Sequence, residues 1–443
     1  MRTLNLPVRR LFGTDGVRGV AGEFLSAELA LSLARAATAL TGAKRVLVIR
    51  DTRESGPMLE AAVAAGIAEA GADALLGGVL PTPAAPLLIG RYGFDAGVVI
   101  SASHNPYRDN GIKFFGGDGF KLGDAVEREI EVALAGPHNP APGPLGSVEP
   151  LHGALEDYLR GLHERFEGLS LTGRRIALDC ANGAASSAAP EIFRRLGAQV
   201  TVLADQPDGR NINDRCGSTH LDSLVALMRA GEHDAGFAFD GDADRVLAVD
   251  RTGTVVDGDE LIALAALSLR DTGRLPGHGV AVTVMTNYGF HTAMREHGVQ
   301  VATTPVGDRH VLHALREREW ALGGEQSGHI IDMGFVPSGD GTAAALLTLE
   351  ALGGGELIDR DVMEKLPQTL VNVRVPDRDA FAGAAGVQAL IEAEQAALEG
   401  RGRVLVRPSG TEPLVRVMVE APTAEEADNT CRRIVTAVDA ALN

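Results

Sequence analysis

Three aspartates stand in a short loop where their carboxylates could bind a divalent cation. Asp240, Asp242 and Asp244 alternate with small residues in FAFDGDADRVLAVD (237–250), between two apolar runs that predict strands. Carboxylates this close repel one another unless a cation offsets them, and oxygen ligands without nearby Cys or His favour Mg²⁺ or Ca²⁺. An EF-hand loop would need Gly and Glu where the chain has Arg245 and Arg251. We therefore predict a hard-cation site, with a solvated acidic turn as the alternative.

A serine follows a predicted buried strand. The apolar run AGVVIS (96–101) leads into Ser103, His104, Asn105 and Pro106. Open α/β sheets bind ligands at the carboxyl ends of their strands, so we expect Ser103 to be reactive. The alternative is a turn in which the hydroxyl only bonds the backbone.

Two further segments carry groups that suit a sugar and a phosphate. In ALGGEQSGHIID (321–332), Glu325 and Ser327 supply an acceptor and a donor for sugar hydroxyls, although a polar turn would have the same composition. In VRPSGTEPLVRV (406–417), guanidinium groups, hydroxyls and free backbone amides form the inventory of a phosphate nest. The residues are Arg407, Ser409, Gly410, Thr411 and Arg416, and a plain hairpin turn is the alternative.

Basic residues also stand near glycine-rich or strand-end positions. Arg18 follows the turn in RLFGTDGVRG (10–19), Lys113 lies in DNGIKFF (109–115), and VGDR spans 306–309, all placed at predicted strand ends or tight loops. The chain has no Walker A motif, no Gly-x-Gly-x-x-Gly fingerprint and no His-Glu-x-x-His motif. Nucleotide-fuelled and zinc-protease chemistry therefore lack support.

The elements that must position these residues alternate between strands and helices. Such alternation indicates βαβ units with mainly parallel sheets, and three α/β blocks can be counted before a different tail. We expect strands over 44–50, 96–101, 174–180, 198–204, 279–285 and 299–304, with helices over 26–40, 57–70, 188–196 and 290–297. The tail predicts a small α+β domain with an antiparallel sheet and a helix that opens on the capping box Thr423-x-x-Glu426. The proline-rich stretch 136–150 predicts a linker, so we expect domains over 1–150, 151–252, 253–368 and 369–443.

Composition limits the partners. The 443 residues include 41 Lys plus Arg against 59 Asp plus Glu, a formal charge of −18, which disfavours nucleic acid and anionic membrane surfaces. Cys180, Cys216 and Cys431 have no metal-ligand or disulfide spacing, no run is apolar enough to span a membrane, and the first residues lack the apolar core of a signal peptide. We expect a cytoplasmic protein.

In their order along the chain, FGTDGVRG, SASHNP, DNGIKFF, DGDADR, GGEQSGH and RPSGTEPLVRV resemble the α-D-phosphohexomutase superfamily. The resemblance covers essentially the whole chain. It implies four domains around a central active-site cleft: three similar α/β domains with mainly parallel mixed sheets, and a smaller C-terminal α+β domain. The glutamine at position 326 is similar to the branch that acts on glucosamine phosphate, whereas the branch that acts on mannose and glucose phosphates usually has Met there. Ala243, where Gly is common, is a small departure.

The resemblance also implies a mechanism. Ser103 would carry a phosphoryl group, and one Mg²⁺ per chain would be held by Ser103, Asp240, Asp242 and Asp244. Arg18 and Arg245 would steady the transferring group, and His104 or Lys113 would move the hydroxyl proton. Glu325 and Ser327 would hold the sugar, and the 407–416 segment the other phosphate.

The implied activity interconverts glucosamine 6-phosphate and glucosamine 1-phosphate through a 1,6-bisphosphate, for amino-sugar nucleotide and cell-wall precursor synthesis. A mannose- or glucose-phosphate mutase is the first alternative. A non-catalytic sugar-phosphate-binding regulator is a more distant one. The oligomeric state is not predictable from this sequence.

Overall fold

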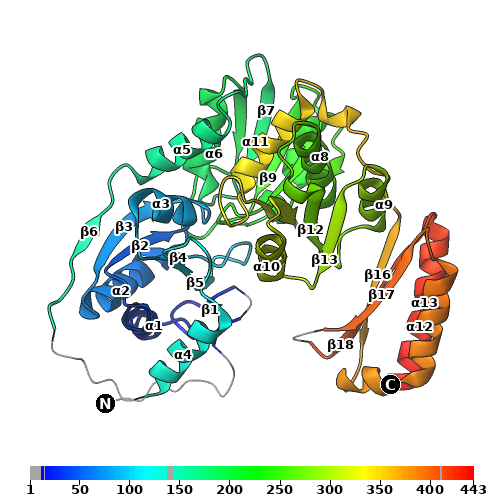
Figure 1. Ribbon diagram of the computed structural model, residues 1–443, viewed down its shortest axis with the longest axis horizontal. Coiled ribbons are helices and arrows are strands. Elements are labelled where there is room, and N and C mark those ends of the chain that lie inside the picture. The colour runs from blue at the N-terminus through cyan, green and yellow to red at the C-terminus, as the bar shows by residue number, and fades with distance from the viewer. Residues whose placement is uncertain (1–10, 14, 137–142, 410–411) are drawn as a thin grey trace. The chain divides into compact units, whose positions relative to one another are not determined.

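The computed structural model describes residues 11–13, 15–136, 143–409 and 412–443, and the chain divides into two compact units. The first comprises Met1–Met285 with Val299–Arg360, and the second comprises Thr286–Gly298 with Asp361–Asn443. Figure 1 shows three sheets with flanking helices in the first unit and one small sheet in the second. No helix within the described ranges is long and apolar enough to cross a bilayer.

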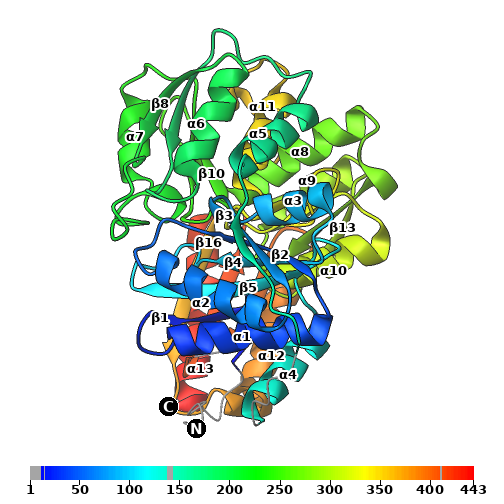
Figure 2. The same ribbon diagram turned by 90° about the vertical axis from the view of Figure 1, so that its left-hand side faces the viewer.

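The first sheet has six strands in the order β1-β5-β4-β2-β3-β6. The pairs among β4, β2, β3 and β6 are parallel, while β5 is antiparallel to both β4 and β1. Apolar residues of α1, α2 and α4 form a core with this sheet, and Figure 2 shows α1 and α2 on the near side. The strands are Val17–Val20, Arg45–Arg50, Asp73–Val79, Ala96–Ile100, Asp109–Gly116 and Val148–Pro150; the helices α1 to α4 are Ala27–Thr41, Gly56–Glu69, Ala84–Tyr92 and Asp124–Ala135.

The second sheet has five strands in the order β11-β10-β9-β7-β8. Its β7 is parallel to β8 and β9, and the chain then turns back through the antiparallel β9, β10 and β11. Leu224 and Met228 of α7 pack on one face against Ala177 and Val249. The strands β7 to β11 are Arg175–Asp179, Gln199–Leu203, Ala235–Phe239, Val246–Asp250 and Val255–Val256; α5 to α7 are Ala154–Arg165, Ala185–Arg195 and Asp222–Arg229.

The third sheet has four strands in the order β13-β12-β14-β15, of which only β15 is antiparallel. Val311 and Leu315 of α10 pack with Trp320 and Ile331 beside it. The strands are Gly279–Thr283, Gln300–Thr304, Leu322–Gly324 and Ile330–Asp332; α8, α10 and α11 are Gly258–Asp271, Asp308–Arg318 and Gly341–Leu352. The helix α9 (Tyr288–Glu296), which links β12 to β13 along the chain, belongs to the second unit.

The second unit is a three-stranded antiparallel sheet, β16-β18-β17, with α12 and α13 packed on it. The strands are Gln368–Arg374, Arg403–Pro408 and Leu414–Glu420, and the helices are Ala385–Ala397 and Ala424–Leu442. The backbone amide of Tyr288 donates to Glu420 Oε2 at 2.8 Å, which ties α9 to this sheet.

The helix signals in the sequence are confirmed at several ends. Ser26 caps α1 by accepting the Leu29 amide, and Gly42 ends that helix in the left-handed conformation, at φ 68°. Thr423 caps α13 by accepting the Glu426 amide, but the Glu426 carboxylate pairs with Arg401, so only half of the predicted capping box forms.

Two expectations need correction. The linker predicted over 136–150 ends in a strand, because β6 pairs in parallel with β3. Lys113, expected near a strand end, lies in the interior of β5 opposite Val99.

Candidate active site

The aspartate loop forms the turn of the β9–β10 hairpin. Asp240, Asp242 and Asp244 are buried, and each offers one carboxylate oxygen such that these atoms all lie within 4.8 Å of one another. Asp242 Oδ1 and Asp244 Oδ1 are buried oxygens without a hydrogen-bond partner. Buried polar atoms are rarely left unpaired, so a cluster of carboxylates with two open oxygens fits a hard cation.

Ser103 lies directly against this loop. Ser103 is 1% exposed, and its hydroxyl donates to Asp240 Oδ2 at 2.5 Å. Gly241 is packed so closely on Ser103 that an added Cβ would come within 2.6 Å of the Ser103 carbonyl oxygen. The structure therefore joins the loop that follows β4 in the first sheet to the hairpin of the second sheet.

Lys113 reaches the same carboxylates from β5. Its ammonium lies 2.8 Å from Asp242, 3.1 Å from Asp15 and 3.7 Å from Asp244. Burial alone would lower the pKa of Lys113, but these three carboxylates outweigh burial and raise that pKa. Lys113 is therefore a fixed positive charge at neutral pH and a poor proton acceptor.

The carboxylates of the loop are held in unequal environments. Burial and the neighbouring charges of Asp244 and Asp242 raise the pKa of Asp240 well above its ordinary value. Burial also opposes ionisation of Asp244, but Lys113, His329 and Arg245 outweigh it and hold the pKa of that carboxyl well below the usual range. A cation bound beside Asp240 would favour its ionised form as well.

His104 follows Ser103 and faces it. Its Nδ1 lies 3.3 Å from the Ser103 hydroxyl oxygen. Burial, with the positive charges of Arg245 and Arg18, lowers the pKa of the imidazole below its ordinary value of 6.5. The ring is therefore neutral at neutral pH, which is the state that accepts a proton.

Of these groups, His104 and Asp244 line a cavity of about 390 Å³, whereas Ser103, Lys113, Asp240 and Asp242 are not among its lining residues. Arg18, His104, Asp244, Arg245 and Glu325 line it, so residues from all three sheets of the first unit meet there. Arg18 is anchored by Asp15 and also donates to the Ala102 carbonyl at 3.3 Å. The remaining lining residues are Leu11, Gly13, Asp15, Gly16, Val306, Gly307, Asp308 and His329.

The GEQSG loop contributes unequally. Glu325 is mostly buried, and its Oε1 accepts the Gly307 amide at 3.0 Å, which places the carboxylate at the cavity wall. The Gln326 side-chain amide donates to Asp257 Oδ2 at 3.2 Å, so it ties the loop to the start of α8. Ser327 is exposed and is not among the residues that line this cavity.

The predicted phosphate nest belongs to the second unit. Arg407 on β17 and Arg416 on β18 are directly opposed in the antiparallel register. Burial and the charge of Arg416 lower the pKa of Arg407. Like charges opposed in this way destabilise a sheet, and a bound anion would relieve the repulsion. Ser409 is buried beside them, whereas Gly410 and Thr411 lie outside the described residues.

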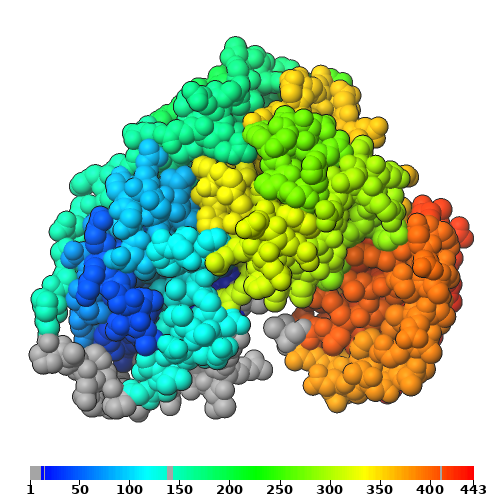
Figure 3. All heavy atoms as spheres, viewed as in Figure 1, coloured from blue at the N-terminus to red at the C-terminus, as the bar shows by residue number. Residues whose placement is uncertain are grey.

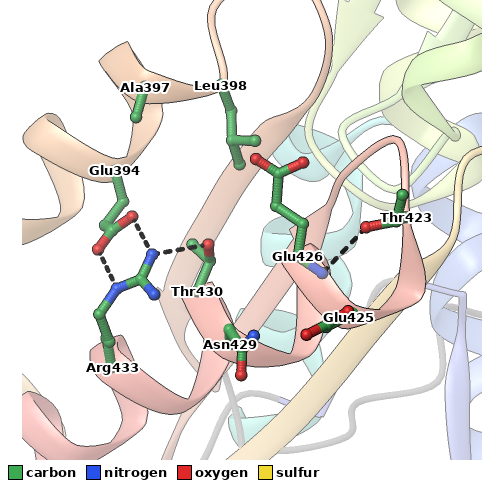
Figure 4. Close-up of a pocket in the computed structure, with 9 residues that line it drawn as sticks. All are labelled: Glu394, Ala397, Leu398, Thr423, Glu425, Glu426, Asn429, Thr430 and Arg433. Carbon is green, nitrogen blue, oxygen red and sulfur yellow. Dashed lines mark hydrogen bonds and ion pairs between the residues drawn. The ribbon is translucent and has the colours of Figure 1, made fainter.

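A second pocket of about 410 Å³ lies between α12 and α13 of the same unit (Figure 4). Arg433 there pairs with both carboxylate oxygens of Glu394 and also donates to the Thr430 hydroxyl. The charges of Arg433 and Glu394 neutralise each other in this pocket, and its lining includes no set of aspartates like that beside Ser103.

Several residues of the site were not predicted individually, although Asp15 and Asp308 lie within segments noted in the sequence. Asp15 contacts Lys113, Arg18 and Lys121, and Lys121 continues to Asp308 at 2.5 Å, which joins the first and third sheets. In Figure 3, cyan atoms from the part of the chain that holds the first sheet lie beside yellow-green atoms from the part that holds the third sheet. Thr82 donates its hydroxyl to Asp242 at 2.6 Å.

Four family models together match most of the chain. The Phosphoglucomutase/phosphomannomutase models of alpha/beta/alpha domains I, II and III match residues 9–139, 151–253 and 257–370, and the model of the C-terminal domain matches 370–437. Among solved structures, a phosphoglucomutase/phosphomannomutase family protein from Burkholderia thailandensis is 25% identical, with a TM-score of 0.82 and 98% coverage of both chains. An N-acetylphosphoglucosamine mutase from Aspergillus fumigatus, solved with GlcNAc-6P and magnesium, shares the fold at 20% identity, with a TM-score of 0.68 and coverage of 98% of this chain and 96% of that one.

Similarity to curated relatives narrows the assignment of the chain to a family. A phosphoglucosamine mutase from Moorella thermoacetica is 52% identical over 95% of this chain and 97% of its own length. One from Clostridium perfringens is 46% identical over 98% of this chain and 100% of its own. On this similarity over nearly its full length, the chain belongs to the phosphoglucosamine mutase family of the α-D-phosphohexomutases, which are isomerases.

Proposed function

We propose that the protein interconverts glucosamine 6-phosphate and glucosamine 1-phosphate through a phosphorylated Ser103. The observation that carries the proposal is the buried Ser103 hydroxyl, 2.5 Å from one of three clustered aspartates. The names of the relatives support an amino-sugar phosphate, and the A. fumigatus enzyme was solved with GlcNAc-6P.

In the first step, the 1-hydroxyl of glucosamine 6-phosphate attacks the phosphorus of phosphoserine 103. The bond between phosphorus and Ser103 Oγ breaks as the bond to sugar O1 forms, and the 1-hydroxyl proton leaves to a base. The 1,6-bisphosphate then turns around, Ser103 Oγ attacks the 6-phosphoryl group, and the proton returns to O6. Glucosamine 1-phosphate and the phosphorylated enzyme result, so atoms and charge balance over the cycle.

The residues that would hold Mg²⁺ are Ser103, Asp240, Asp242 and Asp244. The buried oxygens of Asp242 and Asp244 that have no hydrogen-bond partner support this set, and the A. fumigatus relative was solved with magnesium. When bound, Mg²⁺ supplies charge neutralisation for the transferring phosphoryl group and its leaving oxygen.

The chain's own cations and His104 have separate tasks in this proposal. Phosphoryl transfer depends on positioning and on neutralising charge, and Arg18 and Arg245 both line the cavity where the phosphoryl group would lie. Lys113 holds the aspartate loop in place, since its buried ammonium lies against the Asp242 carboxylate. We assign the proton transfer to His104, because its lowered pKa leaves it neutral while Lys113 stays charged.

The sugar and the second phosphate would be held by the two remaining segments. Glu325, whose carboxylate is fixed at the cavity wall, would accept hydrogen bonds from sugar hydroxyls. Ser327 of the same loop, which is exposed and outside the lining of that cavity, would add a donor once it turns toward the sugar. The opposed guanidinium groups of the second unit support binding of the phosphate that is not reacting. That set is Arg407, Ser409, Gly410, Thr411 and Arg416.

We also propose that the chain is built of four domains, with boundaries near residues 150, 252 and 368. The four separate sheets support this division. The strand β11 (Val255–Val256) pairs with β10 of the second sheet, which favours a second boundary just after Val256.

A parallel assay tests the substrate. Purified protein is given glucosamine, glucose and mannose 6-phosphates with MgCl₂, after priming with a hexose 1,6-bisphosphate. We expect the highest kcat/KM on glucosamine 6-phosphate. Faster conversion of glucose or mannose 6-phosphate would place the protein in the other branch, and no conversion of any of them would favour a non-catalytic binder.

A further inference from the structure

The backbone of Ser103 is held in a conformation that serine rarely adopts. Its φ is 51°, in the left-handed region that favours glycine. A residue keeps such a conformation only where its surroundings over-determine it. The groups that hold the backbone of Ser103 are therefore part of what aims its hydroxyl at Asp240.

Arg53 is the centre of those groups. It follows β2, is 1% exposed, and uses every N–H of its guanidinium on the loop or its support. Nη2 donates to the carbonyl oxygens of Ser103 at 2.9 Å and Asn105 at 2.8 Å. Nη1 donates to the carbonyls of Pro106 and Asp109, the latter at 2.9 Å.

The fifth N–H leads back to the amide of Ser103. Arg53 Nε donates to Asp51 Oδ2 at 2.8 Å, and both side chains of this ion pair are fully buried. The same Asp51 oxygen accepts the Ser101 hydroxyl at 2.7 Å, and Ser101 Oγ accepts the Ser103 amide at 2.9 Å. The Arg53–Asp51 pair thus fixes both backbone polar groups of Ser103.

A side chain from the segment between β8 and β9 of the second sheet also donates hydrogen bonds to the same carbonyls. Asn213 Nδ2 donates to the Ser103 oxygen at 3.0 Å and to the Asn105 oxygen at 3.1 Å. Arg53 is not among the residues that line the cavity of the candidate active site. Its contacts therefore lie with the loop and its support rather than with that cavity.

We infer that Arg53 is a positioning residue that locks the Ser103 loop in the orientation required for phosphoryl transfer. The inference rests on the proposed role of Ser103 as the phosphate carrier. A lysine cannot replace Arg53, because one ammonium cannot reach four carbonyls and a carboxylate in the geometry of a planar fork. Loss of the lock should slow the chemical step and leave substrate binding nearly unchanged.

The test compares Arg53→Lys, Ser101→Ala and Ile49→Ala in the full-length protein. Ser101→Ala cuts the link from Asp51 to the Ser103 amide and leaves both charges in place. Ile49 is a fully buried residue of β2 that faces Gly77, so Ile49→Ala is the control for a weakened core in the same strand. Steady-state kcat and KM for glucosamine 6-phosphate, thermal midpoints and the phosphate content of Ser103 are measured for each.

We expect Arg53→Lys to lower kcat about 100-fold and Ser101→Ala about tenfold, each with KM within about threefold of the unaltered protein, since misplacement of a reacting group by about 1 Å costs this much. Ile49→Ala should lose thermal stability but keep its kcat. Should Arg53→Lys fail to fold, Ser101→Ala decides. The inference is overturned if the folded variants keep the kcat of Ile49→Ala, or if KM rises in step with the fall in kcat. Absence of phosphate on Ser103 in the unaltered protein would instead overturn the proposed function and this inference with it.

Discussion

Replacing Lys113 by methionine removes a cation that is buried against Asp15, Asp242 and Asp244. Three carboxylate oxygens lie 2.8, 3.1 and 3.7 Å from its nitrogen, and Lys113 and Asp242 are each 1% exposed. At an effective dielectric constant of about 20, each contact contributes about 4.5–6 kcal/mol of attraction, much of it offset by desolvation. Removal of one partner from a buried ion pair costs roughly 3–5 kcal/mol, and we expect Lys113→Met to lose that much stability without Mg²⁺.

Bound Mg²⁺ should reverse part of this loss. The metal and Lys113 neutralise the same carboxylates, so the variant should gain more stability from saturating MgCl₂ than the unaltered protein does. By linkage, the variant should also bind Mg²⁺ more tightly, although it is less stable and less active.

Urea unfolding followed by circular dichroism, in EDTA and in saturating MgCl₂, measures both effects. Lys44→Met is the matched control, because Lys44 is exposed in the same domain. The reasoning fails if Lys113→Met in EDTA unfolds within about 1 kcal/mol of Lys44→Met, well below the cost expected for a buried pair. It also fails if MgCl₂ stabilises both proteins equally.

Three further predictions follow from other groups. Burial raises the pKa of Asp340 to about 7, above its value of about 4 in the unfolded chain. The protonated form therefore contributes about 4 kcal/mol to the free energy of unfolding. This contribution is complete below a pH of about 4 and is lost as the pH rises through about 7. Asp340→Asn should therefore flatten the fall of the thermal midpoint between those pH values, and curves that stay parallel would contradict this. Asp242→Asn should abolish the rise in thermal midpoint that we expect MgCl₂ to give the unaltered protein, which corresponds to about 2.7 kcal/mol of stabilisation at 100 times Kd; an undiminished rise would place the metal elsewhere. Arg416→Gln should raise KM about 10-fold or more, the cost of a charge-assisted hydrogen bond, and an unchanged KM would remove Arg416 from the phosphate site.

The sequence predicted those features that local chemistry decides. Ser26 and Gly42 mark the ends of α1 because a capping hydroxyl and a left-handed glycine act on neighbouring backbone groups. The aspartate loop could be identified because three carboxylates within five residues repel one another wherever they lie in the fold. The turn hydroxyl considered for Ser103 is in fact supplied by Ser101, which bonds the Ser103 amide.

Contacts between distant segments could not be predicted in the same way. Lys113 and Asp242 are 129 residues apart, and their meeting depends on how two sheets pack. Asp15 joins Lys121 and Lys113; it lies in the FGTDGVRG segment, but that segment does not reveal which distant side chains it contacts. Arg53 stands two residues after Asp51 at the end of a strand, a spacing that hints at a pair but not at the four carbonyls it binds.

The phosphorylation state of Ser103 tests the central claim most directly. The purified protein is primed with a hexose 1,6-bisphosphate, digested and mapped by mass spectrometry, before and after an excess of glucosamine 6-phosphate. The account predicts a phosphate on Ser103 that the sugar phosphate removes, and a Ser103→Ala variant that folds but has no mutase activity. Appreciable turnover by Ser103→Ala, or an exchangeable phosphate on another residue only, would contradict it.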